Sequence, residues 1–192
     1  MKKKIIITGG LGYIGTELCK LYSGVSWHHE IIVIDNRFIS ERVNQIRNWN
    51  MQFIQGDILD KNLMGKYCSD ADIVHHLAGV TQVPRTKSEA NDSQDKKIIE
   101  VAEQGTQNIL DVISKNCKII FPSTHVVYEG INEVKLDIKE NELTKPVLSY
   151  SSSKAINENQ LKKSGKNYII LRLGSVYGYS TDSMRIDIMP NL

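Results

Sequence analysis

Two residues four positions apart, Tyr150 and Lys154, have side chains that could move a proton together. A helix would place both on one face, a single turn apart. A phenol has a pKa of about 10 and is a poor base at neutral pH, but a neighbouring ammonium favours the phenolate and lowers that pKa. Tyr150 could then accept a proton from a substrate hydroxyl. The same spacing also occurs in surface helical pairs, so the rest of the chain must distinguish the two.

A glycine-rich turn near the N-terminus is the second chemical pattern. Residues 3–15 read KKIIITGGLGYIG, in which a strand-like apolar run, 4–8, leads directly into the glycines. Two overlapping spacings, G-x-G-x-x-G and G-x-x-G-x-x-G, both end at Gly15. Glycine permits a tight turn and a close backbone approach to a pyrophosphate, and the N-terminus of the helix expected next attracts phosphate.

The second apolar run, residues 31–34, ends in Asp35, twenty residues after Gly15. In dinucleotide-binding folds a carboxylate at this distance reaches the ribose hydroxyls of the adenosine. The order strand, glycine turn, helix, strand and acid therefore predicts a bound dinucleotide rather than a glycine turn without a ligand. Asp35 would repel a 2′-phosphate, which favours NAD over NADP, although Arg37 lies close enough to weaken that preference.

Composition indicates one globular domain. The chain has 192 residues, 41% hydrophobic and 24% charged, with a net charge of +2, which gives no reason to expect nucleic acid or an anionic membrane as a partner. No stretch has the length of a membrane span, and the lysines at positions 2–4 precede too few apolar residues for a secretion signal. Three widely separated cysteines form no metal-ligand spacing and indicate reduced structural thiols in a cytoplasmic protein: Cys19, Cys68 and Cys117.

Strands and helices are expected to alternate along the chain. The expected strands are residues 4–8, 31–34, 51–55, 72–77, 118–121 and 168–173, and the expected helices are 16–22, 40–48, 63–68, 96–114 and 146–163. Residues 81–95 are expected to form a loop, and 129–144 an excursion over the mouth of the site. The alternation predicts an α/β Rossmann-type fold, a doubly wound parallel sheet with helices on both faces. Ligands bind at the carboxyl edge of such a sheet.

Together these motifs resemble the extended short-chain dehydrogenase/reductase family, which includes NAD-dependent nucleotide-sugar epimerases and dehydratases. The stretches that carry the resemblance occur in family order over nearly the whole chain: TGGLGYIG (8–15), VIDN (33–36), GDILD (56–60), HHLAG (75–79), EQGTQNIL (103–110), FPSTHVVYE (121–129), PVLSYSSSKAINE (146–158) and LRLGSVYG (171–178).

The resemblance implies roles for individual residues. Those at the pyrophosphate are Gly9, Gly12, Tyr13, Ile14 and Gly15. Those at the adenosine ribose are Asp35, Asn36 and Arg37, and those bordering the adenine are Asp57 and Ile58. Three residues would line the path to the nicotinamide ribose: Leu77, Ala78 and Gly79. Lys154 would bind that ribose and tune Tyr150.

The resemblance also implies a reacting group and a substrate wall. Thr124 stands where the family has its catalytic Ser or Thr and would hydrogen-bond the reacting sugar oxygen, although a threonine at a strand end can equally satisfy local backbone. His125 is either a substrate-side wall residue or a surface histidine. The expected substrate residues are Thr81, Thr124, His125 and Ser175.

Departures from the family pattern narrow the chemistry. In 4,6-dehydratases an Asp-Glu pair follows the catalytic Thr, and related decarboxylases have Glu at the second of these positions, whereas here His125 and Val126 follow Thr124. Epimerisation or a simple oxidation or reduction remains. Ala102 and Ser175 each replace an Asn that is frequent in relatives. The pair His75-His76 is interpreted as packing, and no metal site is expected.

The leading hypothesis is an NAD-dependent nucleotide-sugar epimerase that acts at C4 through a transient 4-keto sugar. The alternatives are an NAD(P)-dependent keto-sugar or carbonyl reductase and a non-catalytic dinucleotide sensor. Residues 1–178 are expected to form the NAD-binding domain with the catalytic Tyr and Lys, and 179–192 the start of a truncated or disordered substrate-binding region. Helices 96–114 and 146–163 are expected to form a homodimer contact.

Overall fold

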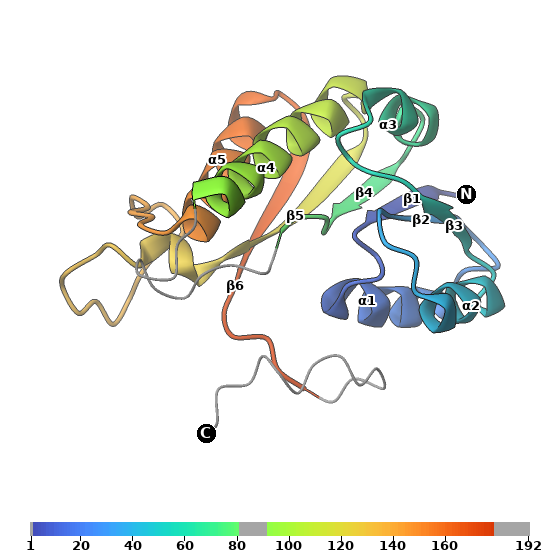
Figure 1. Cartoon of the computed structure of the whole chain (residues 1–192), viewed down its shortest axis with the longest axis horizontal. Coiled ribbons are helices and arrows are strands. Elements are labelled where there is room, and N and C mark those ends of the chain that lie inside the picture. Colours follow the sequence, from blue (N-terminus) through green and yellow to red (C-terminus); the bar gives the residue numbers. More distant parts are fainter. Residues whose placement is uncertain (1, 81–91, 179–192) are drawn as a thin grey trace.

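The computed structural model describes residues 2–80 and 92–178 and contains a six-stranded parallel sheet in the order β3-β2-β1-β4-β5-β6 (Figure 1). The strands are β1 (Lys4–Thr8), β2 (Glu30–Asp35), β3 (Gln52–Gln55), β4 (Ile73–His76), β5 (Lys118–Thr124) and β6 (Asn167–Leu173). The helices are α1 (Tyr13–Ser23), α2 (Ser40–Asn48), α3 (Lys61–Cys68), α4 (Asp92–Val112) and α5 (Ser149–Lys163), with a 3-10 turn η2 (His125–Tyr128). The predicted doubly wound fold is confirmed.

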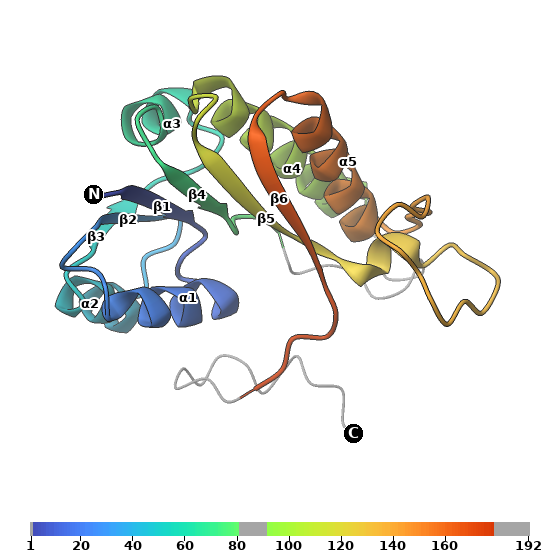
Figure 2. The same cartoon turned by 180° about the vertical axis from the view of Figure 1, so that it is seen from behind.

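Helices cover the sheet in two layers. Figures 1 and 2 show α1 and α2 on one face and α3, α4 and α5 on the other. The side chains of β1 alternate between the two layers, so Ile6 belongs to the core cluster beneath α3 and α4, and Ile5 and Ile7 to the cluster beneath α1 and α2. Burial on both faces explains why β1 and β2 read as continuous apolar runs.

Several element boundaries differ from expectation. Residues 92–95 are expected in a loop but begin α4, so the predicted loop 81–95 is wrong over that part, and residues 81–91 lie outside the described residues. Helix α1 begins at Tyr13 rather than at residue 16, because Gly12 is already the N-cap. Helix α5 begins at Ser149 rather than at 146, since the N–H groups of Val147 and Leu148 bond the Glu129 carboxylate from outside the helix.

Strand β5 continues three residues beyond the predicted end and includes Pro122. Proline cannot donate to a sheet ladder and is normally confined to edges. The exception here has a simple cause, because β4 pairs only with Lys118–Ile120 and Pro122 therefore faces a neighbouring strand on one side alone. The extension brings Thr124 to the carboxyl edge of the sheet.

The three cysteines are buried and free, as the structural interpretation of their spacing predicts. Burial raises the pKa of the Cys19 and Cys68 thiols to about 12 and that of Cys117 to about 11, so all three remain protonated at neutral pH. None of the helices that the structure describes is both long and apolar enough to cross a membrane.

Candidate active site

The glycine turn folds back tightly between β1 and α1. Gly9 has φ +70°, a conformation that favours glycine, and a Cβ there would lie 2.6 Å from the Ala78 nitrogen. A Cβ at Gly15 would lie 2.5 Å from the Gly9 oxygen. Gly12 caps α1 without a side chain, so the first N–H groups of the helix, beginning at Tyr13 and Ile14, point outward and suit an anion.

Asp35 holds the glycine turn from the end of β2. Its carboxylate is 5% exposed and accepts hydrogen bonds from the Leu11 N–H at 3.0 Å and the Arg37 N–H at 3.0 Å. The Arg37 guanidinium also donates to it, with Nε at 3.2 Å. Asp35 and Arg37, both predicted at the adenosine ribose, therefore pair with each other beside the turn.

Asn36 and Asp57 meet at the ends of β2 and β3. The Asn36 amide donates to the Asp57 carboxylate at 3.0 Å, and that carboxylate also accepts from the Leu59 N–H at 2.9 Å. Ile58 is 5% exposed and belongs to the core cluster under α4, where a Cβ at Gly105 would lie 2.3 Å from its Cδ1. Of the two residues predicted at the adenine, Asp57 is thus at the surface edge and Ile58 is largely a packing residue.

The segment after β4 lies against the glycine turn. Leu77 donates its N–H to the Thr8 carbonyl at 3.1 Å, and Ala78 donates its N–H to the Thr8 hydroxyl at 3.3 Å. The close approach of Gly9 and Ala78 brings the two loops into backbone contact. The predicted pyrophosphate and nicotinamide-ribose residues therefore share one edge of the sheet.

Helix α5 brings Tyr150 and Lys154 to the end of β5. The Lys154 ammonium donates to the Pro122 carbonyl at 2.9 Å, lies 4.6 Å from the centre of the Phe121 ring and lies 5.9 Å from the centre of the Tyr150 ring. The two residues lie on one helix face, as their spacing predicts. The lysine bonds the strand two residues before Thr124, which links the three predicted catalytic residues to one strand end.

Burial sets the protonation of this pair. It lowers the pKa of Lys154 to about 8 and raises the pKa of Tyr150 above its usual value near 10. From the sequence we expect the ammonium to lower the tyrosine pKa, whereas desolvation is the dominant effect in the protein alone. A cationic group bound beside Tyr150 would favour the phenolate and so lower the pKa of the tyrosine.

The predicted substrate residues that the structure describes lie near the paired ends of β5 and β6. Thr124 is 7% exposed, and its hydroxyl oxygen accepts from the Val126 N–H at 3.2 Å, which leaves the hydroxyl proton for another acceptor. His125 is exposed and contacts the Leu173 carbonyl through Nδ1 at 3.2 Å, and Ser175 is exposed. Thr81 lies outside the described residues. Tyr13, predicted at the pyrophosphate, donates to the Gly178 carbonyl at 2.8 Å, so the segment after β6 reaches α1.

Two further residues support the site and were not predicted. Arg42 is buried on α2 and donates to the Leu11 carbonyl, which fixes the glycine turn from below. Its position one residue before Val43 and four before Ile46, on the apolar face of α2, could have indicated a buried role. Glu129 accepts from the Val147 and Leu148 N–H groups at 2.7 Å each and from the Ser151 hydroxyl, and so anchors the start of α5.

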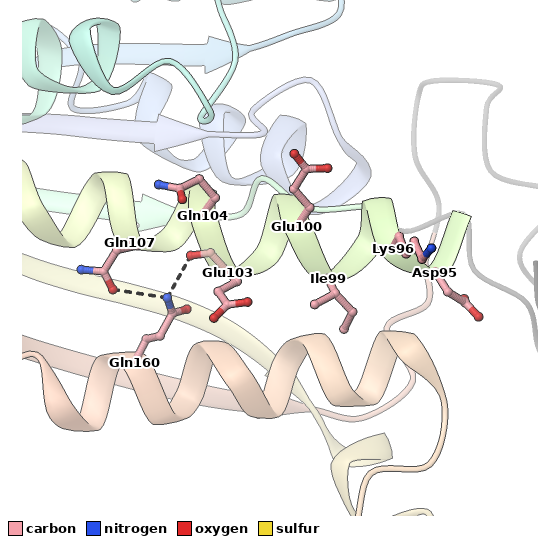
Figure 3. Close-up of a pocket in the computed structure, with 8 residues that line it drawn as sticks. All are labelled: Asp95, Lys96, Ile99, Glu100, Glu103, Gln104, Gln107 and Gln160. Atoms are coloured by element: carbon pink, nitrogen blue, oxygen red, sulfur yellow. Dashed lines mark hydrogen bonds between the residues drawn. The ribbon is translucent and has the colours of Figure 1, made fainter. Parts of the chain in front are cut away.

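A hollow lies along α4 where it faces α5 and is separate from this site (Figure 3). The Gln160 amide crosses from α5 to the Glu103 carbonyl at 2.9 Å and to Gln107 at 3.4 Å. None of the lining residues was predicted at the site: Asp95, Lys96, Ile99, Glu100, Glu103, Gln104, Gln107 and Gln160. Within residues 2–80 and 92–178, no group of three or more His, Cys, Asp or Glu could hold a metal ion.

Comparison with known proteins identifies a family and several relatives that act on nucleotide sugars. The NAD dependent epimerase/dehydratase family matches over residues 5–190. A UDP-N-acetyl-alpha-D-glucosaminuronate decarboxylase of Bacillus cytotoxicus is 35% identical over 130 residues, which cover 67% of this chain and 38% of the relative. A putative UDP-glucose 4-epimerase of Methanocaldococcus jannaschii is 33% identical over 187 residues, covering 93% and 57% of the two chains.

Solved structures agree with these relatives. The UDP-glucose 4-epimerase of Brucella ovis in complex with NAD superposes with a TM-score of 0.70 at 27% identity, over 88% of this chain and 51% of the other. The present chain spans about half the length of the curated relatives that it matches. The family match over residues 5–190 includes the glycine turn and helix α5.

Proposed function

The chain belongs to the NAD dependent epimerase/dehydratase family, and from this premise we propose that it forms the NAD-binding and catalytic part of a nucleotide-sugar epimerase acting at C4. The observation that carries the proposal is the placement of Lys154, which is anchored to the Pro122 carbonyl with its ammonium beside the Tyr150 ring. A dinucleotide sensor needs the glycine turn but has no use for such a pair.

The chain's own residues fit NAD. A Cβ at Gly9 or Gly15 would meet backbone atoms at 2.6 Å or 2.5 Å, so both glycines are needed for the tight turn against which a pyrophosphate would lie. The start of α1 presents N–H groups there. Asp35 favours a free ribose over a phosphorylated one. NAD, when bound, would accept and return the hydride of the sugar C4. The residues proposed to hold it are Gly9, Gly12, Tyr13, Ile14, Gly15, Asp35, Asn36, Arg37, Asp57, Ile58, Leu77, Ala78, Gly79, Tyr150 and Lys154.

Proton transfer belongs to Tyr150. Its phenolic oxygen would take the proton of the C4 hydroxyl during oxidation and return it once hydride has reached the opposite face of the 4-keto sugar. The charged Lys154 and the positive nicotinamide ring would both stabilise the phenolate against the desolvation that raises its pKa. The Thr124 hydroxyl, with its proton free of the Val126 bond, would donate to the sugar oxygen.

The two residues after Thr124 favour epimerisation over elimination. His125 is exposed and directed to the Leu173 carbonyl, and the side chain of Val126 carries no carboxylate. A carboxylate at these positions is the feature that the resembling dehydratases and decarboxylases use. Reduction of a keto sugar with external NAD(P)H uses the same Tyr150 and Lys154, and turnover assays must distinguish it.

We also propose a cellular compartment, an oligomeric state and a division of the chain into two parts. The three buried free thiols suit a reducing cytoplasm. Helices α4 and α5 lie side by side on one face of the sheet and would meet their copies in a homodimer (Figure 1). Residues 1–178 would form the NAD-binding unit, and the segment from 179 would begin the region that binds the sugar, with His125 and Ser175 at its border.

The test uses full-length protein purified without added cofactor. The protein is denatured, released NAD is quantified, and turnover of nucleotide sugars is measured without external cofactor. Stoichiometric NAD and turnover that Tyr150→Phe abolishes would support the epimerase. The matched control is Tyr168→Phe on β6, which removes the hydroxyl of a tyrosine that is 38% exposed and should leave turnover unchanged.

Two other results would redirect the proposal. An empty protein that consumes NADH with a keto substrate is a reductase rather than an epimerase. Bound NAD without any Tyr150-dependent turnover would instead indicate the sensor.

A further inference from the structure

Four buried polar side chains form a hydrogen-bonded chain beneath the carboxyl edge of the sheet. The Thr8 hydroxyl lies 3.0 Å from Nδ1 of His76, and Nε2 of His76 lies 2.9 Å from the Thr106 hydroxyl. The Asn157 amide donates to that hydroxyl at 2.8 Å. All four are at most 4% exposed, so each bond forms where water cannot replace it.

The two ends of this hydrogen-bond chain lie at the two parts of the proposed site, the glycine turn and the helix that carries Tyr150. Thr8 immediately precedes Gly9, and its hydroxyl also accepts the Ala78 N–H at 3.3 Å. Asn157 stands three residues after Lys154 on α5 and donates to the Ala102 carbonyl as well, at 2.8 Å. The glycine turn and the segment after β4 together form what we call the dinucleotide cradle. The hydrogen-bond chain thus runs from this cradle, through β4 and α4, to the helix that holds Tyr150 and Lys154.

His76 is the central member, and few other side chains could replace it. Burial lowers its pKa to about 3, and the nearby charge of Lys154 acts in the same direction, so the imidazole is neutral. A neutral imidazole donates from one ring nitrogen and accepts at the other, and in either tautomer it can bond both threonine hydroxyls. An aliphatic residue of similar size would fill the space and break the chain.

The adjacent histidine gives an internal comparison. Successive side chains of a strand point to opposite faces, so His75 faces α1, where its Nε2 lies 2.8 Å from the Tyr22 hydroxyl. His75 has the same side chain and the same strand, but this bond leads to neither the cradle nor α5. Variants on this face report what a buried histidine contributes without connecting the two halves.

We propose that His76 is a positioning residue that holds the dinucleotide cradle and the Tyr150–Lys154 helix in fixed register through Thr8 and Thr106. Apolar packing also joins these layers, but packing permits small sliding movements, whereas a chain of directed bonds fixes orientation. The consequence for catalysis rests on the proposed function, because a shift of about 1 Å between hydride acceptor and proton acceptor can cost about 100-fold in rate.

The experiment removes hydroxyls rather than the histidine, because threonine and valine have nearly the same shape. In full-length protein, Thr106→Val should raise the dissociation constant of NAD by about three- to tenfold, the size expected for one neutral hydrogen bond. Thr106 bonds none of the residues proposed to hold NAD, so this effect must be transmitted. Thr106→Ser should restore the constant, and Tyr22→Phe should change it by less than about twofold.

Two readouts separate positioning from general loosening. The effects of Thr8→Val and Thr106→Val should be non-additive, since each breaks the same chain. In turnover, kcat should fall more than KM rises, because the misplacement matters most in the transition state. The inference is overturned if Thr106→Val behaves like Tyr22→Phe or if the two threonine effects simply multiply.

A third readout needs no cofactor. Thr106→Val should accelerate hydrogen exchange at the Ala78 amide, which bonds Thr8 at the far end of the chain, and Tyr22→Phe should not. If the wild-type protein binds no NAD, the proposed function fails while this measurement still decides the linkage. Unchanged exchange at Ala78 would overturn the inference even in an active enzyme.

Discussion

The two ends of the sheet are covered to very different degrees. In β1 and β2 the isoleucines are at most 2% exposed, because helices pack on both faces. In β6, by contrast, Ile169 is 39% and Leu171 45% exposed, because α5 covers only one face of that strand. The sheet is therefore covered by helices on both faces at β1 and β2, which we call the finished end, and on one face only at β6, which we call the half-covered end.

This difference coincides with the proposed division between cofactor binding and substrate binding. The proposed dinucleotide cradle lies where β1, β2 and β4 end, and Asp35 and Arg42 both bond Leu11 within it. The proposed substrate side instead lies at β5, β6 and α5, where Glu158 of α5 and Arg172 of β6 form an ion pair 2.6 Å apart. Cofactor binding should thus be the more robust of the two properties, and variants at each end can test that.

The largest effect is expected at the finished end. An added methyl in Gly15→Ala would meet the backbone of Gly9 and Gly10 at 2.5 Å and 2.6 Å, which cannot be relieved by a rotamer. We expect a loss of about 3 kcal/mol in unfolding free energy and about 100-fold in NAD affinity. Denaturant unfolding and calorimetric titration measure the two. Gly174→Ala, whose new methyl has no atom within 4 Å, is the matched control. Normal NAD binding by Gly15→Ala would contradict the proposal that the glycine turn holds NAD.

The next effect should be at the half-covered end. Glu158 accepts from Arg172, Ser123 and Lys162 with its side chain 1% exposed, so Glu158→Ala leaves a mostly buried guanidinium without its carboxylate. We expect the unfolding free energy to fall by about 3 kcal/mol. Asp111→Asn, which breaks a surface pair with Lys61, should change it by less than about 1 kcal/mol in the same urea titration. Equal losses would show that the Glu158 pair is not what joins the end strands.

The same carboxylate predicts an acid transition. Burial raises the pKa of Glu158, but bonds from Arg172, Ser123 and Lys162 outweigh it and lower the pKa to about 2 from 4.5. Since the unfolded chain binds the proton more readily, the stabilisation is complete above pH 4.5 and disappears as the pH falls toward 2. Stability measured through that window should decline less steeply in Glu158→Gln than in the wild type.

A smaller effect is expected at Lys154, where the substitution should stabilise the protein instead of destabilising it. Its pKa falls from 10.5 to about 8 in the folded protein, so between these values the unfolded chain binds more protons and stability should rise with pH. Lys154→Met should remove that rise, abolish turnover, and stabilise the protein by about 1 kcal/mol at neutral pH. Lys162→Met, on the outer part of the same helix, should retain the pH dependence. A destabilised Lys154→Met protein would show that the bond to Pro122 outweighs the cost of burial.

The smallest difference tests the exposed face directly. Ile32→Val, at a site 2% exposed, should cost about 1 kcal/mol in unfolding free energy, whereas Ile169→Val should cost about 0.3 kcal/mol. The substitution is chemically identical, so the comparison isolates the covering of the two strands. Thermal or urea unfolding of both variants is sufficient. Equal costs would mean that the exposed face of β6 is covered in solution.

The parts of this structure that were predictable have local causes. Continuous isoleucine runs, the glycine spacing, and the single turn between Tyr150 and Lys154 each depend on a few neighbouring residues, and all three predictions of element type are confirmed. The parallel sheet agrees with the strict alternation of strands and helices. The roles of the individual cofactor and substrate residues stay predictions.

The remainder depends on partners distant in the sequence. No periodicity indicates that Glu129 anchors α5, which moves the helix start from 146 to 149, or that β4 is too short to meet Pro122. The sequence predicts packing for His75-His76, and both side chains are buried, but each also has a hydrogen-bond partner at least 30 residues away. Replacement of an Asn by Ala102 suggests a lost bond, yet its carbonyl accepts the Asn157 amide.

The strand order has a consequence for synthesis on the ribosome. Strand β1 emerges first, β2 and β3 add successively on one side of it, and β4, β5 and β6 add successively on the other. Each of the six described strands therefore joins an open edge, and none of them has to insert between two that are already paired. A nascent chain can build this sheet outward in the order of translation, N-terminal elements first.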